Sequence, residues 1–402
     1  MISLLYGLTL VLLPLYLWAS GLPQIGHLVG VFWMAVTFLT ARRFPWDKAF
    51  NYLVIFILYA LIVDSFVFLK YLDYHTILSP IYYLYNFAFM YALILTARRM
   101  GNFRFFKYTT YLFLLLLVAQ FLLNFSGLGR ADGGYRAMGT FNDPNQFAHW
   151  VLWSVLIVAG GSFYIFRSLL LAWIGLGLGV VLLILSTSRS GLLGMSWVFL
   201  SLMLIPIEAS LRAVVKGRVH FNLAKLMVKV IPVALLLVFS TGAIVHFFPG
   251  IQATISSHAD FYVTRIAKGI QKSKENLEER GYDRLWKFPE YTVLGAGEGA
   301  NYRWQERTTF LDEIHSTLAG LVFSYGIVGS FAFLGFIYHL WKRLPLFWLR
   351  LFLIAPFLYG LGTYNLRNTM FWLGLGFFWI LADALRYETT FKALNREVLK
   401  TK

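Results

Sequence analysis

Apolar runs of about 20 residues recur along almost the whole chain, separated mostly by short polar connections. A helix of about 20 apolar residues is long enough to cross the roughly 30 Å hydrocarbon core of a membrane. The pattern therefore predicts an all-α polytopic membrane protein with about twelve transmembrane helices. We expect them at 3–20, 24–40, 50–69, 77–96, 109–126, 146–162, 168–186, 190–207, 228–247, 315–338, 346–363 and 368–385.

One polar, charge-dense stretch interrupts this pattern, roughly from Pro249 to Ile314. It divides the chain into helices one to nine (1–248), a loop domain (249–314), and helices ten to twelve with a tail (315–402). We expect the two apolar parts to form one bundle. The first apolar run lacks a strong positive flank and a small-residue cleavage site, so we interpret it as a retained span and not a signal peptide.

Basic residues alternate between the two sides that these helices define. With the N-terminus inside, the short outward connections hold few of them: Lys70, Arg130, Arg136, Arg189 and Arg367. The inward connections and the tail are richer in Lys and Arg, so the positive-inside rule predicts that both termini are cytoplasmic. Four polar segments then share the outward face: 130–146, 186–191, 249–315 and 364–368.

Composition supports a membrane class and excludes several chemistries. The 402 residues are 59% hydrophobic and only 13% charged, whereas soluble domains are about 25% charged. A formal charge of +16 is expected for basic cytoplasmic loops, so we predict membrane lipid and no nucleic acid as a partner. The chain has no cysteine, which excludes disulfides. No Walker A loop, H-E-x-x-H motif or outward D-x-D is present, so we expect no metal and no cofactor.

Two outward segments carry an arginine in a polar turn. Arg189 lies between Ser188 and Ser190, and a planar guanidinium surrounded by hydroxyls suits phosphate oxygens. The alternative is an arginine that only reaches the lipid headgroups. Arg136 precedes a turn-rich segment with Asn142 and Asn145, which either support a site or cap turns and the following helix.

The long loop offers two further arginines and leads to a histidine. Arg265 lies on an expected amphipathic helix, and Arg284 precedes a G-x-G-x-G segment at 295–299 that is a weak phosphate-loop signal. His315 begins the tenth expected helix. Its ordinary pKa of about 6.5 suits a general base, although it could merely anchor the helix. We expect Asp312 or Glu313 to orient it and to raise its pKa.

In their order, these pieces resemble the O-antigen ligase and polymerase superfamily of bacterial envelope glycosyltransferases. The similarity covers roughly the sixth to the tenth helix. It is carried by Arg136 with Gly139–Asn145, Ser188–Gly191, Arg284-x-Trp286 with Gly295 and Gly297, and His315 with Gly326 and Gly329. The ligase branch is the most similar, because it combines one long loop late in the chain with a histidine at its end. The family histidine is often followed by Asn, whereas Ser316 follows here.

The resemblance implies an enzyme of the bacterial inner membrane with a periplasmic active site. It would transfer polysaccharide from undecaprenyl diphosphate to lipid A–core oligosaccharide, without metal and with inversion. His315 would be the base, and Arg189, Arg136 and either Arg265 or Arg284 would bind the diphosphate. The alternatives are a polymerase, a protein O-oligosaccharyltransferase, and a lipid-linked glycan transporter. A transporter usually needs more charges within its spans than Asp64 and Asp383.

Overall fold

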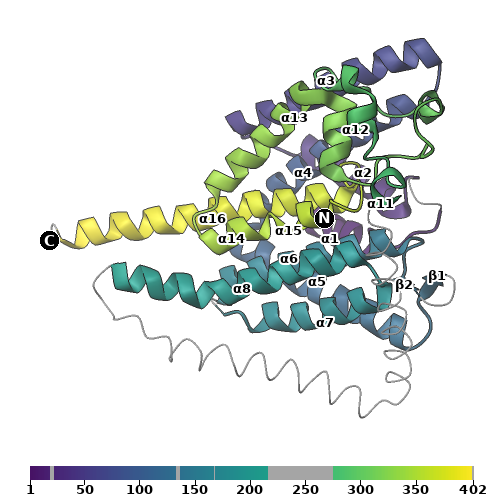
Figure 1. The fold of residues 1–402 in the computed structure, drawn as a ribbon. Helices are drawn as coiled ribbons and strands as arrows, with labels where there is room; N and C mark the ends of the chain where they lie inside the picture. The colour runs from purple at the N-terminus through teal and green to yellow at the C-terminus, as the bar shows by residue number, and fades with distance from the viewer. Residues whose placement is uncertain (19–21, 133–135, 167, 216–274, 401–402) are drawn as a thin grey trace.

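The computed structural model describes residues 1–18, 22–132, 136–166, 168–215 and 275–400 (Figure 1). It is 73% helical. The helices are α1 (Ile2–Leu12), α2 (Ile25–Leu39), α3 (Lys48–Tyr71), α4 (His75–Met100), α5 (Asn102–Phe125), α6 (Pro144–Phe166), α7 (Leu170–Ser186), α8 (Arg189–Val215), α11 (Glu275–Glu278), α12 (Arg284–Lys287), α13 (Thr317–Arg343), α14 (Phe347–Phe352), α15 (Ala355–Tyr359) and α16 (Thr369–Lys400). The remaining elements are an antiparallel hairpin, β1 (Arg130–Asp132) and β2 (Arg136–Gly139), and the 3₁₀ turns η1 (Pro289–Tyr291) and η2 (Asn301–Trp304).

Within the described ranges, six helices are long and apolar enough to cross a membrane: α3, α4, α5, α6, α13 and α16. Shorter apolar helices occupy five more of the expected positions: α1, α2, α7, α8 and α14–α15. The expected ninth span, 228–247, lies outside the described residues. The all-α membrane architecture therefore holds, and the total of twelve spans stays a prediction.

Two expected spans are shorter than predicted, and proline explains both. Helix α1 ends at Leu12 and not near residue 20, because Pro14 has no backbone N–H with which to continue the helical hydrogen bonds. The expected helix 346–363 is split into α14 and α15. Pro356 lies in the first turn of α15, where its missing N–H costs nothing but where it cannot continue the preceding helix.

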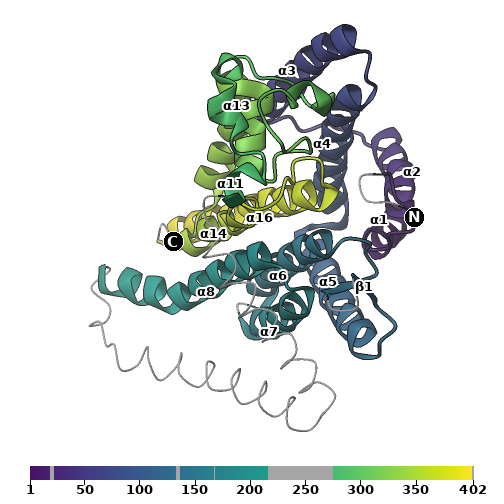
Figure 2. The same cartoon turned by 45° about the vertical axis from the view of Figure 1, so that its right-hand side comes forward.

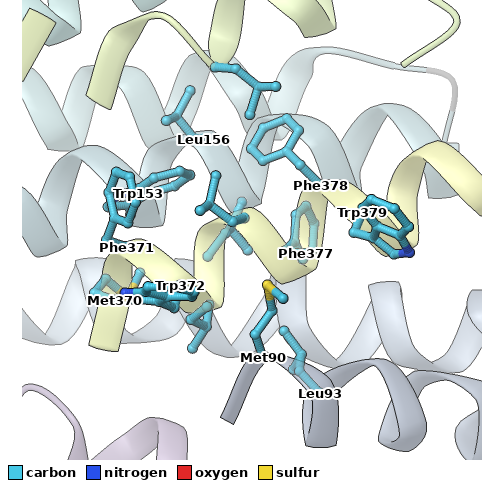
Figure 3. Close-up of a cluster of buried hydrophobic side chains, with 14 of the residues drawn as sticks. Met90, Leu93, Trp153, Leu156, Met370, Phe371, Trp372, Phe377, Phe378 and Trp379 are labelled. Carbon is cyan, nitrogen blue, oxygen red and sulfur yellow. The ribbon is translucent and has the colours of Figure 1, made fainter. Parts of the chain in front are cut away.

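Helix α16 forms the centre of the bundle. In its apolar segment 89% of the residues are buried, against 28% in the apolar segment of α5. Figure 3 shows its aromatic side chains between Trp153 and Leu156 of α6 on one side and Met90 and Leu93 of α4 on the other. Gly374 allows α16 to pack closely against α6, since a Cβ there would lie 2.1 Å from the ring of Trp153.

Large apolar side chains also cover the outside of the helices. Phe66, Leu69, Leu115 and Phe331 are each more than 60% exposed, at 68%, 71%, 64% and 73%. Soluble proteins rarely expose such continuous apolar surface. Its presence on long helices is what contact with lipid requires.

An ion cluster joins three helices at the end of the bundle opposite the hairpin. Arg343, in the last turn of α13, pairs with Asp47 at 2.7 Å and with Asp383 at 2.5 Å. Asp47 is also the N-cap of α3, where its side chain accepts the Ala49 N–H. Asp383, which the sequence places inside an apolar run, is therefore a paired residue that stabilises helix packing.

Helix α13 is broken at Gly326, where φ is +60° and ψ is −169°. The break leaves the carbonyls of Phe323 and Ser324 without their helical donors. The loop supplies replacements, because the N–H groups of Ala296 and Gly297 donate to these carbonyls at 2.9 and 2.8 Å. The break also frees the Ile327 N–H, which donates to the loop carbonyl of Thr292 at 2.9 Å.

The glycine segment 295–299 is therefore docked into a helix break. Glycine is required at Gly326, because a Cβ there would lie 2.2 Å from the carbonyl oxygen of Val293. Further along, the Glu298 N–H donates to Asp64 at 2.8 Å. A phosphate-binding loop needs free N–H groups, and these groups are occupied. The phosphate-loop interpretation of this segment is wrong.

Candidate functional site

Polar segments from distant parts of the sequence meet at one end of the bundle. In Figure 1 the hairpin and α11 lie at the right-hand end, which comes forward in Figure 2. Hydrogen bonds connect them: Arg136 Nε donates to Thr187 Oγ1 at 3.0 Å, and Thr317 N–H donates to the carbonyl of Gly360 at 2.7 Å. Arg367 pairs with Glu313, and Ser190 and Arg280 both lie against Gly362. The described parts of all four segments that the sequence assigns to one face thus contribute to the same end.

A cleft of about 410 Å³ opens at this end. Its polar wall comes from α6 and the segments that flank α13 and α16: Asp143, Asn145, Gln146, Glu313, His315, Asn365, Arg367 and Asn368. Apolar side chains complete it: Leu13, Leu22, Phe141, Trp150 and Met370. A cleft lined by both charged and apolar side chains fits an amphipathic ligand.

His315 lies on the wall of this cleft, one residue before the N-cap of α13. The ring packs edge-on against Phe310, with centroids 5.2 Å apart. The pKa of His315 is lowered from 6.5, first by partial burial and then by the positive charge of Arg280. Asp312 and Asp143 act in the opposite direction but do not outweigh these effects. The imidazole is therefore neutral at pH 7.

Asp312 raises the pKa of His315 as expected, but burial and Arg280 outweigh it, so the net shift is downward. Glu313 pairs instead with the guanidinium of Arg367. The backbone at Asp312 is held by Arg284, whose Nη2 donates to the Asp312 carbonyl at 2.6 Å. Among the described residues, no hydrogen bond joins either carboxylate to the imidazole.

Arg280 is the arginine that the structure places beside His315. The His315 N–H donates to the Arg280 carbonyl at 3.0 Å. A Cβ added to Gly362 would lie 2.1 Å from Ser190 Oγ and 3.1 Å from Arg280 Nη1, so both side chains lie against that glycine. Within the described residues the half-buried Arg280 side chain makes no hydrogen bond or ion pair. The sequence indicated only that Arg280 is one of several loop arginines.

Arg189 begins α8 next to this group. Ser188 is a helix cap, since its Oγ accepts the Gly191 N–H at 3.2 Å. Ser190, by contrast, contacts Gly362 as described above. Arg189 is half-buried, and in the described part of the chain nothing pairs with its guanidinium. Arg189 and Arg280 thus both keep free donors near the turn at 188–190.

The segment after β2 is more structural than the sequence suggested. Arg136 bonds Thr187 and also reaches Asn145 Oδ1 at 3.4 Å, so it fixes the hairpin to α6 and α7. Asn142 donates its amide to the carbonyl of Trp18. The cap of α6 is neither asparagine but Asp143, which accepts the N–H groups of Asn145 and Gln146 at 2.7 and 2.8 Å.

We expected Arg265 or Arg284 of the long loop to bind the diphosphate, and the structure places only Arg284. Arg265 lies outside the described residues, as does most of the expected helix 258–277. Arg284 is only 2% exposed and donates to the carbonyls of Phe310 and Asp312, both at 2.6 Å. Burial lowers its pKa to about 10, so it still carries its charge at pH 7. Arg284 therefore stabilises the loop backbone that leads to His315.

Arg367 is a cleft residue that the sequence interpretation left out of the site. Its guanidinium pairs with Glu313, lies 3.7 Å from Glu298 Oε2, and covers the ring of Tyr364 at 5.5 Å. It lies two residues before the start of α16, in the polar segment that joins α15 to α16. Its outward position was the available signal, because a basic residue is unusual on that side.

Among the described residues, no three His, Asp or Glu side chains gather as a metal site would need. The fold and the cleft together define a helical membrane-type protein with a polar site at one end of its bundle. The chain matches no known protein-family model, and no curated protein is significantly similar to it in sequence.

Proposed function

We propose that this protein is a membrane glycosyltransferase of the O-antigen ligase type. It transfers polysaccharide from undecaprenyl diphosphate to lipid A–core oligosaccharide at the periplasmic face of the bacterial inner membrane. The observation that carries the proposal is the juxtaposition of two residues: His315, which lines the cleft and has a lowered pKa, and Arg280, whose guanidinium lies against the cleft residue Gly362. His315 would be a neutral base that accepts a proton, and Arg280 would be a cation that stabilises the leaving diphosphate.

The chemistry follows from these two groups. The imidazole of His315 accepts the proton of an acceptor hydroxyl as that oxygen bonds to the anomeric carbon. The bond from the anomeric carbon to the diphosphate oxygen breaks, and the electron pair leaves with the diphosphate. Arginine donors stabilise the charge that develops there. We assign this role to Arg280 and Arg189. A single displacement inverts the anomeric configuration, by analogy with inverting glycosidases.

The apolar side chains of the cleft suit the lipid parts of both substrates. Leu13 and Leu22 come from the connection between α1 and α2, and Trp150 comes from α6. A polyprenyl or acyl chain against these side chains would leave the diphosphate within the same cleft as the charged residues. The arrangement supports a lipid-linked donor over a soluble nucleotide sugar.

The deciding experiment offers purified protein an undecaprenyl-diphosphate-linked glycan with one of three acceptors, in excess chelator. Lipid A–core should become glycosylated, and His315→Ala should not catalyse transfer. Product formed only on the growing glycan would identify a polymerase, and product on a protein acceptor an O-oligosaccharyltransferase. Movement of the intact donor across vesicles without any product would identify a transporter. Loss of transfer on chelation would contradict the metal-free mechanism.

A further inference from the structure

A second cavity, of about 390 Å³, lies directly beside the His315 cleft. The two share three lining residues: Glu313, Tyr364 and Arg367. Because Arg367 and Glu313 form an ion pair, that pair is part of the wall between the cavities. A ligand with its reacting end in the cleft could extend past this pair into the second cavity.

The second cavity is lined by aromatic rings and by hydrogen-bond acceptors. The rings are Tyr302, Trp304, Phe323 and Tyr364, and the acceptors include Asp73, Asn301 and Glu313. Aromatic faces provide flat apolar contact, while amides and carboxylates fix orientation by hydrogen bonds. This combination matches a pyranose, which has an apolar face and a rim of hydroxyl groups.

Arg284 adds a fixed cation to the lining of the same cavity. It lines the cavity and is 2% exposed. Its Nη2 donates to the loop carbonyls of Phe310 and Asp312, so the guanidinium is held in place.

The far wall of the cavity is rigid. Glu298, which is 8% exposed, accepts hydrogen bonds from Ser79 at 2.5 Å and Tyr325 at 3.0 Å. It also accepts from Tyr83 and Tyr364. Because its carboxylate is held from α4, α13 and the α15–α16 segment, the ring of Tyr364 is fixed where the two cavities meet.

We propose that this second cavity binds neutral sugar residues of the lipid-linked glycan, next to the sugar that reacts at His315. The inference rests on the proposed function, because that function supplies the glycan. Three carboxylates, Asp73, Glu298 and Glu313, and two guanidinium groups, Arg284 and Arg367, line the cavity. Asp73 and Glu313 can accept bonds from sugar hydroxyls, and the excess of one negative charge disfavours acidic sugars.

Two residues test this site without disturbing the core. Tyr302 is 50% exposed and Asn301 is half-buried, and both belong to η2. The other rings are more deeply packed, so their removal would confuse binding with folding. Trp286 is the matched control, since it is 54% exposed on the same loop and lines neither cavity.

The experiment measures the affinity of purified protein for undecaprenyl diphosphate alone, for the same lipid carrying a neutral oligosaccharide, and for that oligosaccharide released from the lipid. The wild type should bind the glycosylated lipid at least about tenfold more tightly than the bare lipid. Tyr302→Ala and Asn301→Ala should each reduce this advantage about 5- to 10-fold, as expected for one lost contact. Both variants should bind the bare lipid as the wild type does, and Trp286→Ala should match the wild type throughout. Unchanged melting temperatures show that the variants fold.

Equal wild-type affinity for bare and glycosylated lipid would overturn the sugar site, as would unaltered affinities in both variants. If an acidic oligosaccharide increased the affinity of the lipid as much as a neutral one does, the assignment of the cavity to neutral sugars would be overturned. Failure of the bare lipid to bind would instead count against the proposed function. In that case binding of the released oligosaccharide, and its dependence on Tyr302, still decides the sugar site.

Discussion

The backbone N–H of His315 donates a hydrogen bond to the carbonyl of Arg280 across 3.0 Å. This bond joins residues 35 positions apart and ties the start of α13 to the end of the loop turn that carries Arg280. It fixes the imidazole relative to that arginine backbone. The charge of Arg280 in turn lowers the pKa of His315. The two residues are therefore coupled both in position and in protonation.

Replacement of His315 should remove most of the transfer activity. His315→Ala should reduce the rate by roughly 100- to 10,000-fold, because a general base contributes about this much. Binding of the lipid diphosphate should remain, since the arginines are intact. Initial rates and donor affinity, measured on the same preparation, test both statements. A variant that keeps its rate would remove His315 from the mechanism.

The pH dependence of activity should report the coupling with Arg280. Because the pKa of His315 is lowered, the neutral base persists below pH 6.5, and activity should fall only as the pH drops through that lowered value. Arg280→Ala removes a positive charge, so the pKa of His315 should rise. The acid limb of the pH–rate profile should then move to higher pH. An unmoved limb would show that the two side chains do not interact.

Arg280 and Arg189 should each need the planar guanidinium. Arg280→Lys and Arg189→Lys keep the charge but lose the bidentate fork. Each should slow transfer by a factor of about 30 to 1000, equal to roughly 2–4 kcal/mol of transition-state stabilisation. Arg307→Lys is the control, because Arg307 is exposed and pairs with Glu290 at 3.2 Å away from the cleft. Wild-type rates in both site variants would leave the diphosphate without its assigned ligands.

The break in α13 should tolerate no side chain at Gly326. Gly101→Ala provides the comparison, because Gly101 also has a positive φ but has nothing within 4 Å of an added Cβ. That change should cost about 1–3 kcal/mol from backbone strain. Gly326→Ala adds a collision with the Val293 carbonyl and should cost about 2–5 kcal/mol in total. Unfolding in detergent measures both, and equal costs would contradict the docking of the loop into the break.

The ion cluster at the opposite end should contribute to stability and not to chemistry. Arg343→Met leaves Asp47 and Asp383 without their shared partner and should lower the unfolding free energy by about 1–3 kcal/mol. Lys342→Met is a matched control from the same helix turn, and its effect should stay within about 0.5 kcal/mol. Transfer rates should be unchanged in both at a temperature where both are folded. A lost rate in folded Arg343→Met would mean that this cluster takes part in function.

The sequence by itself determined where the helices lie and which polar segments share an end. Apolar length decides which runs are helices that can cross a membrane. The alternation of direction from one helix to the next then brings the segment at Arg136, the turn at Arg189 and the residues around His315 to one side. This follows from chain connectivity alone, so no knowledge of packing was needed. The end of α1 and the start of α15 could also be predicted, because Pro14 and Pro356 act on the backbone locally.

The tertiary structure decided which of the arginines in the described part are free and in which direction the pKa of His315 moves. Arg280 and Arg284 are four residues apart and similar in sequence context, yet one lies beside the cleft and the other is buried under loop carbonyls. Their difference arises because the loop is paired with the broken α13 through bonds such as Ile327 to Thr292. Burial and neighbouring charge depend on such contacts between residues far apart in the chain, and a local pattern of residue types carries no record of them.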